Sequence, residues 1–532
     1  MSNKTEGETL VLDYDLFGLP TAQHKAGLAG LILLIDSMNA RKLSPVPIAE
    51  YDATTARISF TRESMKTIFN DLYKGIAVTT KKGDEKIRPA LEYLSIGFGM
   101  PCVWIHAWQD CIMSVIRKGR ALKIYETGYD GQQEYMRLYS NYMASSDFDA
   151  SLIIPGEAQS AEKIHITGMR ANNFLLHFCL IPSLVFVPSF IVKETNPKTK
   201  TSEWVQSFNL NNKRRGPFFT LVIPEPSNLI DFVKDAKAIL RHLSSDIYGY
   251  RPKEAVINIP AEGGLEYLYY FVQAQMKKQD IDEALLSVDI YYMEQQGKII
   301  RTLTSERIIP SYDVLENYDA LRKSCHNPLF KGQRIRNLLA GESWYRGMDT
   351  IFNQYPLAFF VNNKDSPHMP FFGNDVVRKY RALENQVQFI KGGGLMNDET
   401  GDAQLALCVR RLIRKYVYRK SEDKSGVKYE KIKDHKDDKG RIIYPLKYLE
   451  ALENTCGDAF LAMRSRRDND FVEYFTGSIC SVPQYLPQND YLLVSQFLLS
   501  DWERVKTLAM LALSSVSQVG GHSEESEKGE EK

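Results

Sequence analysis

The sequence predicts an α+β protein, in which a mixed N-terminal body with short sheets is followed by an all-α C-terminal helical bundle. Between residues 126 and 330, short β-branched or aromatic runs bounded by Gly, Pro or Asn alternate with helical patterns. From about residue 375 onward, the apolar residues recur at helical spacing. A chain of 532 residues has room for about two to four domains.

The N-terminal region is expected to open with a polar, turn-like stretch and a tightly packing helix. Residues 12–38 read LDYDLFGLPTAQHKAGLAGLILLIDSM, and Pro20 suits the first helical turn, where a missing N–H costs nothing. Gly27 and Gly30 lie on one face of this helix and carry no side-chain bulk. We therefore expect another backbone to pack closely against that face.

Three polar side chains, Gln23, His24 and Lys25, stand between Pro20 and the apolar part of the helix. Their chemistry suits phosphate or RNA. A plain core helix explains the same pattern, so both interpretations stay open.

The remaining elements follow from periodicity. Strands are predicted over residues 50–60, 165–169, 184–187, 218–223 and 255–259, and hairpins over 79–87 and 288–303. Helices are predicted over residues 62–74, 104–116, 228–243, 375–390, 402–419, 446–466 and 491–515, with Asn228 as an N-cap. The apolar residues 174–192 contain two prolines, which favours buried strands over a membrane helix. The predicted domains are 1–125, 126–374, 375–519 and a disordered acidic tail, 520–532.

Composition excludes several classes of protein. A net charge of +1 is not that of a globally basic DNA-binding protein, so any nucleic-acid contact has to come from local patches. The seven cysteines form no CxxC pair and no signal peptide is visible, which favours a reduced, cytoplasmic protein. HExxH, GxSxG, Walker and GxGxxG motifs are absent, so we predict no catalytic residue, no metal and no cofactor. An enzyme of unknown type stays open, because a site assembled in space needs no local motif.

The stretch 12–38 resembles the start of the large subunit of type I CRISPR Cascade complexes, in the I-B-like branch, and the C-terminal region resembles the small subunit. The resemblance implies a non-catalytic subunit that recognises the protospacer-adjacent motif on double-stranded DNA, aids strand separation and R-loop formation, and supports effector recruitment. The implied partners are the CRISPR guide RNA, double-stranded target DNA, the Cascade backbone and small subunits, and a helicase–nuclease or transposition proteins, with no membrane. It implies guide RNA or subunit contact for Gln23, His24 and Lys25. A scaffold subunit without direct nucleic-acid contact is the alternative.

Two short basic segments are candidates for contact with the DNA motif or backbone. The stronger reads NLNNKRRG, in which asparagines match base edges and cations match phosphates: Asn211, Asn212, Lys213, Arg214 and Arg215. The weaker reads GMRANN and offers Arg170, Asn172 and Asn173. A solvated surface turn is the alternative for each.

The helix predicted at 402–419 separates two kinds of side chain. Its apolar side holds Leu405, Val409, Leu412, Ile413 and Tyr416, and its other side holds Arg410, Arg411, Arg414, Lys415 and Arg419. No acid lies between Ala403 and Lys420, so we expect an external anion, the displaced DNA strand, to neutralise this face. A second basic node comprises Arg464, Arg466 and Arg467. A free cationic surface is the alternative.

Three consecutive glycines at 392–394 predict a flexible joint between two helices. The purine-rich codons of Lys391 and these glycines also suit a ribosome-binding sequence ahead of Met396. In the resembled family the C-terminal part is often translated separately as the small subunit. We therefore predict a separate product from Met396 to Lys532, a bundle of about four helices that buries its own core.

Overall fold

The computed structural model describes residues 9–72, 75–79, 85–89, 130–147, 167–195, 199–206, 218–247, 256–274, 281–296, 299–361, 369–391, 398–432, 435, 442–482 and 487–517. The chain divides into two compact units: unit 1, Met1–Phe190 with Ser207–Asp319, and unit 2, Ile191–Gln206 with Ala320–Lys532. This grouping differs from the four predicted domains, whose boundaries stay predictions. The predicted α+β class is confirmed, with short sheets in the N-terminal part and helices in the C-terminal part.

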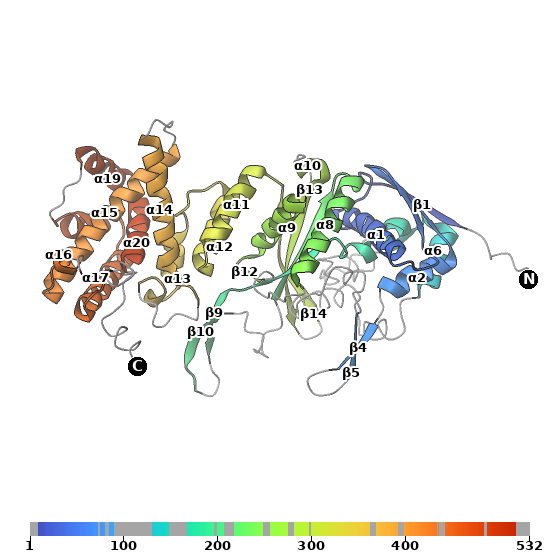
Figure 1. The fold of residues 1–532 in the computed structure, drawn as a ribbon, viewed down its shortest axis with the longest axis horizontal. Coiled ribbons are helices and arrows are strands. Elements are labelled where there is room, and N and C mark those ends of the chain that lie inside the picture. Colours follow the sequence, from blue (N-terminus) through green and yellow to red (C-terminus); the bar gives the residue numbers. More distant parts are fainter. Residues whose placement is uncertain are drawn as a thin grey trace, which may run out of the picture. The chain divides into compact units, whose positions relative to one another are not determined.

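Unit 1 contains two main sheets. The smaller has three antiparallel strands in the order β1–β3–β2, namely β1 (Leu10–Asp15), β2 (Ile48–Tyr51) and β3 (Thr55–Phe60). The larger has the order β12–β8–β11–β13–β14, namely β8 (Leu184–Pro188), β11 (Phe218–Pro226), β12 (Val256–Ile257), β13 (Leu285–Gln296) and β14 (Ile299–Ile308). Three long helices lie beside it (Figure 1): α1 (Ala22–Ala40), α8 (Leu229–Ile247) and α9 (Pro260–Ala274).

Smaller elements complete unit 1. The helices are α2 (Arg62–Leu72), α6 (Gly131–Asn141), α7 (Arg170–Leu175), the 3₁₀ turn η1 (Leu176–Phe178), α10 (Ile281–Ala284) and α11 (Tyr312–Ser324), within which the chain passes to unit 2. The strands are β4 (Gly75–Thr79), β5 (Glu85–Pro89), β6 (Ser145–Asp147) and β7 (Thr167–Met169), paired as two antiparallel ladders.

Helix α1 packs against other backbone, as its glycines predict. A Cβ atom on Gly27 would overlap the carbonyl oxygen of Leu175, and one on Gly30 would overlap that of Phe178. Both carbonyls belong to the α7–η1 segment. Leu31, like its apolar neighbours in the helix, is fully buried, so α1 is a central helix of unit 1.

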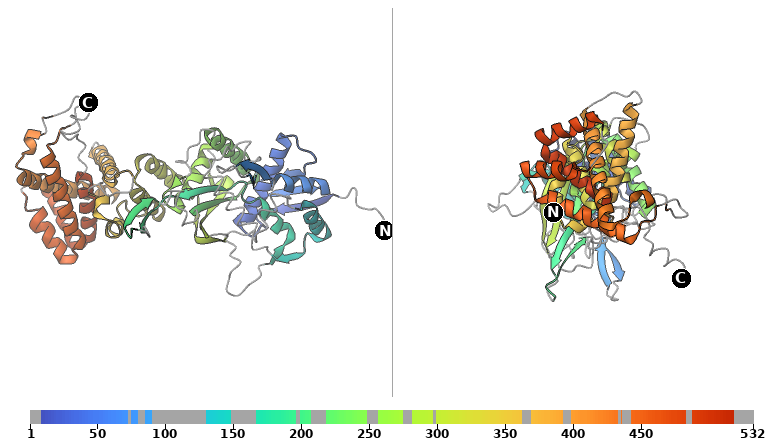
Figure 2. Two further views of the ribbon diagram at one scale, coloured as in Figure 1. Left: turned by 90° about the horizontal axis from the view of Figure 1, so that it is seen from below. Right: turned by 90° about the vertical axis from the view of Figure 1, so that its left-hand side faces the viewer.

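Unit 2 is mainly helical, and Figure 2 shows its helices gathered in one bundle. Its elements are the hairpin β9 (Ile191–Thr195) with β10 (Ser202–Gln206), then α12 (Pro328–Ala340), α13 (Met348–Gln354), η2 (Leu357–Phe359), α14 (Phe372–Lys391), α15 (Asp398–Ser425), α16 (Tyr429–Ile432), α17 (Leu446–Ser465), α18 (Asp468–Tyr474), the π-helical turn η4 (Phe475–Ile479), α19 (Gln488–Ser500) and α20 (Trp502–Ser517). Helices α14, α15, α17 and α20 surround a common core, because each packs against at least two of the others.

Aromatic rings fill the part of this core next to α12 and α13. Phe352 and Phe360 make edge-to-face contacts at 5.0 Å, and Phe372 and Phe460 lie 5.1 and 5.6 Å from Phe360. Such contacts contribute about 0.5–1.5 kcal/mol per pair beyond buried area. They join α13, α14 and α17 to one core.

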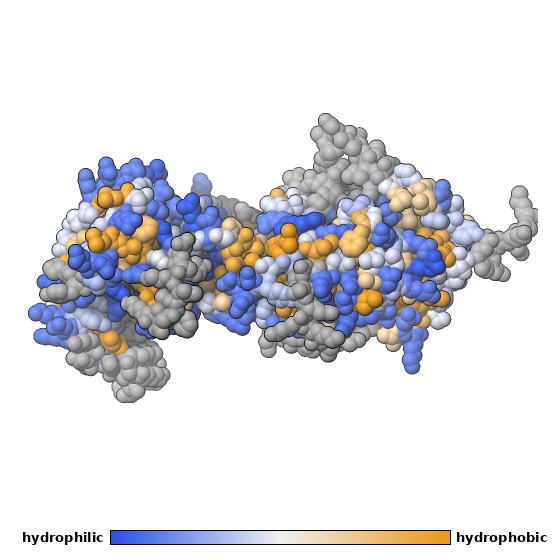
Figure 3. Space-filling model, turned by 90° about the horizontal axis from the view of Figure 1, so that it is seen from above, coloured by the Kyte–Doolittle hydropathy of each residue, from blue (hydrophilic) through white to orange (hydrophobic). Residues whose placement is uncertain are grey.

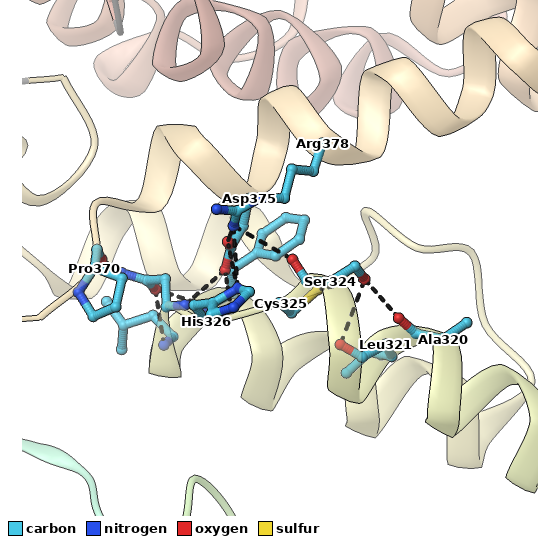
Figure 4. A network of polar contacts seen from close by, with 11 residues as sticks. Ala320, Leu321, Ser324, Cys325, His326, Pro370, Asp375 and Arg378 are labelled. Atoms are coloured by element: carbon cyan, nitrogen blue, oxygen red, sulfur yellow. Dashed lines mark hydrogen bonds and ion pairs between the residues drawn. The ribbon is translucent and has the colours of Figure 1, made fainter. Parts of the chain in front are cut away.

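A buried carboxylate ties the loop between α11 and α12 to the start of α14 (Figure 4). The side chain of Asp375 is fully buried and accepts hydrogen bonds from the backbone N–H groups of His326 and Asn327 at 2.7 and 2.6 Å. Arg378 pairs with its other oxygen at 2.5 Å. Burial raises the pKa of Asp375, whereas the two backbone donors and Arg378 act in the opposite direction. Asn327, also buried, caps α12 and donates to the Pro370 carbonyl at 2.8 Å.

Three sequence predictions are wrong. The stretch predicted as turn-like is the strand β1 up to Asp15 and turns only over residues 16–21, and Pro20 precedes the helix because Thr21 is its N-cap. The predicted helix 491–515 is two helices, since Asp501 is non-helical and its carboxylate accepts from the Arg504 N–H at the start of α20. The first part of 174–192 is helical, and strands begin only at β8.

The other predicted elements that the structure describes are confirmed to within a few residues, whereas helices such as α9 and α11 and the β9–β10 hairpin were not predicted. The strand at 50–60 is resolved into β2 and β3, and Asn228 caps α8 by accepting from the N–H groups of Ile230 and Asp231. The predicted helix 104–116, the tip of the 79–87 hairpin, the glycine joint and the acidic tail lie outside the described residues. No helix in the described ranges is long and apolar enough to span a membrane.

Candidate nucleic-acid interface

The three polar residues at the start of α1, whose chemistry suits phosphate or RNA, are buried. Gln23, His24 and Lys25 are 4, 1 and 9% exposed. The Lys25 ammonium group pairs with Glu225 of β11 at 2.8 Å, and burial lowers the pKa of His24 to about 4, so its ring is neutral at pH 7. Contact with guide RNA or another subunit stays a prediction, and it would require these side chains to leave their interior positions.

The cluster that receives Lys25 is a charge-balanced network in unit 1. Glu225 also accepts from the Ser287 hydroxyl at 2.7 Å and lies 3.4 Å from Arg307, which pairs with Asp289 at 2.7 Å. Two carboxylates thus face two cations across α1, β11, β13 and β14. Lys25 and its two polar neighbours therefore form part of the interior of unit 1.

The GMRANN segment has structural contacts. Arg170 donates to the carbonyl of Arg137 at 3.3 Å, and Asn173 donates to the Ser146 hydroxyl at 2.9 Å. Asn172 is half-buried on the same short helix. The NLNNKRRG segment, with Asn211, Asn212, Lys213, Arg214 and Arg215, lies outside the described residues, between β10 and β11. DNA contact by either segment stays a prediction.

Helix α15 has the two sides that the sequence predicts, but the expectation that only an external anion balances its cations is wrong. Neighbouring helices and the helix itself supply carboxylates. Arg410 pairs with Glu384 of α14 at 2.8 Å, Arg411 pairs with Asp490 of α19 at 2.9 Å, and Arg419 lies within 3.6 Å of Glu422 and Asp423. The search for acids between Ala403 and Lys420 missed Glu384 and Asp490 because they come from other helices, and it missed Glu422 and Asp423 because they follow in the last turn of α15.

The α15 face nevertheless stays cationic and accessible. Arg411 and Arg419 are 53 and 59% exposed, and Arg414 and Lys415 are exposed as well. Arg410 differs, since its side chain is 17% exposed and lies over the Tyr380 ring. Arg419 and Asp423 are 59 and 55% exposed, and exposed ion pairs contribute about 0–1 kcal/mol, so a phosphate can replace Asp423 here at little cost. Asp490, the partner of Arg411, is only 9% exposed. We call Arg411, Arg414, Lys415 and Arg419 the α15 face.

The second basic node lies at the C-terminal end of α17. Arg464 donates to the Asn353 carbonyl at 2.6 Å, and Arg466 pairs with Asp470 at 3.3 Å and lies over the Tyr474 ring. Arg467 is exposed. Lys506 of α20 donates to the Arg466 carbonyl at 2.5 Å, which brings a fourth cation to this end of α17.

Sequence reasoning missed a tyrosine among these cations. Tyr418 follows Arg414 by one helical turn and is partly exposed on the α15 face, with the Arg414 guanidinium 5.2 Å from its ring centre. The sequence signal was the four-residue spacing between Arg414 and Tyr418, which places both on one side of the helix. The sequence analysis considered only apolar and basic positions and overlooked it.

Unit 2 also exposes apolar side chains. On α19, Leu492 and Leu499 are 60 and 84% exposed and lie two turns apart on one face. Figure 3 shows apolar patches beside strongly hydrophilic ones on this side of unit 2. Within the described ranges, no group of three or more His, Cys, Asp or Glu residues is placed to hold a metal ion.

Comparison with known protein families shows to which family the chain belongs. The family model of the Type I-B CRISPR Cas8b N-terminal domain matches residues 85–281, and that of the Type I-B CRISPR Cas8b C-terminal domain matches residues 285–516. The chain belongs to the Cas8b family of type I-B CRISPR large subunits. Comparison with curated proteins gave no match.

Family membership confirms the predicted resemblance. The Cas8b matches begin after the stretch 12–38 that suggested it, so two separate parts of the chain point to one family. The C-terminal match includes the whole α15 face and the basic node of α17.

Proposed function

We propose that this Cas8b chain is the non-catalytic large subunit of an RNA-guided surveillance complex, in which unit 2 holds the displaced DNA strand on the α15 face. The chain recognises the protospacer-adjacent motif on double-stranded DNA, aids strand separation and R-loop formation, and supports recruitment of a helicase–nuclease or transposition proteins. The observation that carries the proposal is the group of four exposed cations on one side of α15. No covalent step is needed, since base pairing with the guide RNA reads the target.

Contact with the backbone and small subunits of the complex forms part of this proposal. What supports it is the exposed apolar face of α19, with Leu492 and Leu499. Exposed apolar side chains of this kind, rimmed by polar ones, are typical of protein interfaces.

Charge reversal on the α15 face is expected to weaken target binding. In the assembled complex, Arg411→Glu combined with Arg414→Glu and Lys415→Glu should lower affinity for target DNA at least about 10-fold at 100 mM salt. The slope of log affinity against log salt should fall by about 0.7 for each lost single-strand phosphate contact. A binding titration at several salt concentrations measures both.

The control is Arg57→Glu on β3, because Arg57 is an arginine as exposed as those of the α15 face, at 60%, and pairs with the exposed Asp13 at 2.7 Å. Unchanged affinity in the α15 variant would instead favour a scaffold that does not touch nucleic acid.

The NLNNKRRG segment is proposed as the motif reader from its chemistry alone. Arg214→Ala should weaken binding to all targets and reduce its salt dependence, because the arginine holds phosphate. Asn212→Ala should instead erode discrimination between motif variants. Titrations across motif sequences separate the two effects, and identical behaviour of both variants would remove this assignment.

The proposed separate product from Met396 would start after α14, and this changes the expectation that it buries its own core. Helix α14 packs on α15 and α20: the Tyr380 hydroxyl donates to the Leu508 carbonyl at 3.2 Å, and a Cβ atom on Gly373 would overlap the Ser514 carbonyl oxygen. A product without α14 would therefore expose the surfaces of α15 and α20 on which α14 packs. It also loses Glu384, so Arg410 becomes a further unpaired cation.

Internal initiation predicts a specific loss. Replacing Met396 by a non-start codon, with the codons of Lys391–Gly394 recoded synonymously, should abolish a band of roughly 15 kDa while the full chain is unaffected. Immunoblotting against the C-terminal part measures it. If wild-type preparations never contain that band, the chain has no separate product.

A further inference from the structure

A tight turn folds the chain back beside the end of α15. Gly426 has a positive φ of 72°, which suits glycine, and its N–H donates to the Glu422 carbonyl at 2.9 Å. The carboxylate of Glu422 then accepts from the Tyr429 N–H at 2.8 Å. These bonds place α16 against α15.

The turn brings two tyrosine rings together. Tyr418 of α15 and Tyr429 of α16 stack with ring centres 4.9 Å apart and planes 26° apart. Both are partly exposed. The Arg414 guanidinium lies 5.2 Å from the Tyr418 ring centre and interacts with the side chains of both tyrosines.

A second stacked pair nearby shows what a purely internal arrangement looks like. Tyr444 and Tyr448 stack with ring centres 6.0 Å apart, and they are 7 and 0% exposed. The Tyr418–Tyr429 pair differs because both of its rings are partly exposed, and Tyr418 lies on α15 among the cations of the α15 face.

We propose that Tyr418 and Tyr429 form a base-stacking platform for single-stranded nucleic acid. A base lies against the tyrosine stack beside Arg414, while the other α15-face cations hold the neighbouring phosphates. Stacking of this kind is tolerant of sequence, because every base presents a π-face. The inference rests on the proposed function and supplies the way in which unit 2 holds the displaced strand.

The test compares DNA with and without bases. The full chain is titrated with a fluorescent single-stranded oligothymidylate and with an abasic oligomer of equal length and charge. The wild-type protein should prefer the base-bearing strand about 10-fold, the effect of one stacked base. Tyr418→Leu and Tyr429→Leu should remove this preference while leaving abasic affinity and the salt slope unchanged, and Tyr418→Trp should retain it.

The chain offers a matched control in Tyr139→Leu. Tyr139 is a partly exposed residue of α6 that stacks on Tyr135 with ring centres 5.6 Å apart. This variant should keep the full preference for bases. Thermal melting of each variant checks that unit 2 stays folded.

The outcomes separate this inference from the proposed function. Equal, salt-dependent binding of both oligomers by the wild-type protein would overturn the platform and leave the phosphate contacts standing. A leucine variant that weakens both oligomers alike would also overturn it, as the rings would then act only in packing. The proposed function would be overturned as well if the wild-type protein bound neither oligomer and the complex with the charge-reversed α15 face kept its affinity for target DNA.

Discussion

Gly30→Ala is expected to destabilise unit 1 by about 3 kcal/mol or more, although alanine is the better helix former by about 1 kcal/mol. The added methyl group would overlap the Phe178 carbonyl oxygen and approach Pro182 to 3.1 Å. Helix α1 is central to the unit, so it cannot move away without opening the core. Urea unfolding of the full chain, followed by hydrogen exchange of α1 peptides, measures the loss.

The control is Gly401→Ala in α15, where an added Cβ atom meets nothing within 4 Å. That variant should be neutral or more stable by up to about 1 kcal/mol. If both alanine variants behave alike, close backbone packing of α1 does not hold unit 1 together.

Asp375→Ala is expected to cost about 3–5 kcal/mol, because it removes a buried carboxylate with three partners. The N–H groups of His326 and Asn327 would lose their acceptor within the protein interior, and Arg378 would lose its ion pair (Figure 4). The start of α14 should then detach from the α11–α12 loop. Thermal unfolding and protection of residues 325–330 against hydrogen exchange measure this.

An exposed ion pair of the same unit provides the comparison. Asp458 is 75% exposed and pairs with Lys424 at 3.0 Å, so Asp458→Ala should cost less than about 1 kcal/mol. Equal losses in the two aspartate variants would show that Asp375 does not anchor α14.

The sequence was most informative where a pattern is local. The spacing of Gly27 and Gly30 predicted close packing, and Asn228 predicted a helix start, because both effects act within a turn of helix. The prediction that Lys25 binds phosphate or RNA was a weaker inference, since the partner of Lys25, Glu225, comes from a strand 200 residues away. Burial of a cation depends on such distant partners, which one sequence does not display.

The same limit applies to the candidate site. The cations of α15 were identified from helical spacing, but Asp490 and Glu384, which pair with two of them, come from other helices. The Tyr418–Tyr429 stack depends on the turn at Gly426, so periodicity within α15 does not reveal it. Helical spacing in the sequence thus located the cationic surface of α15. Its acidic partners and its stacked tyrosines could be identified only from the three-dimensional structure.

Site-specific crosslinking tests the central claim most directly. A photoreactive residue at position 415 replaces an exposed lysine for which no ion pair is found among the described residues. In a complex loaded with guide RNA and bound to target DNA, it should crosslink to the displaced strand, and one at position 57 should not. Crosslinks from position 415 to the guide-paired strand or to protein alone would contradict the account.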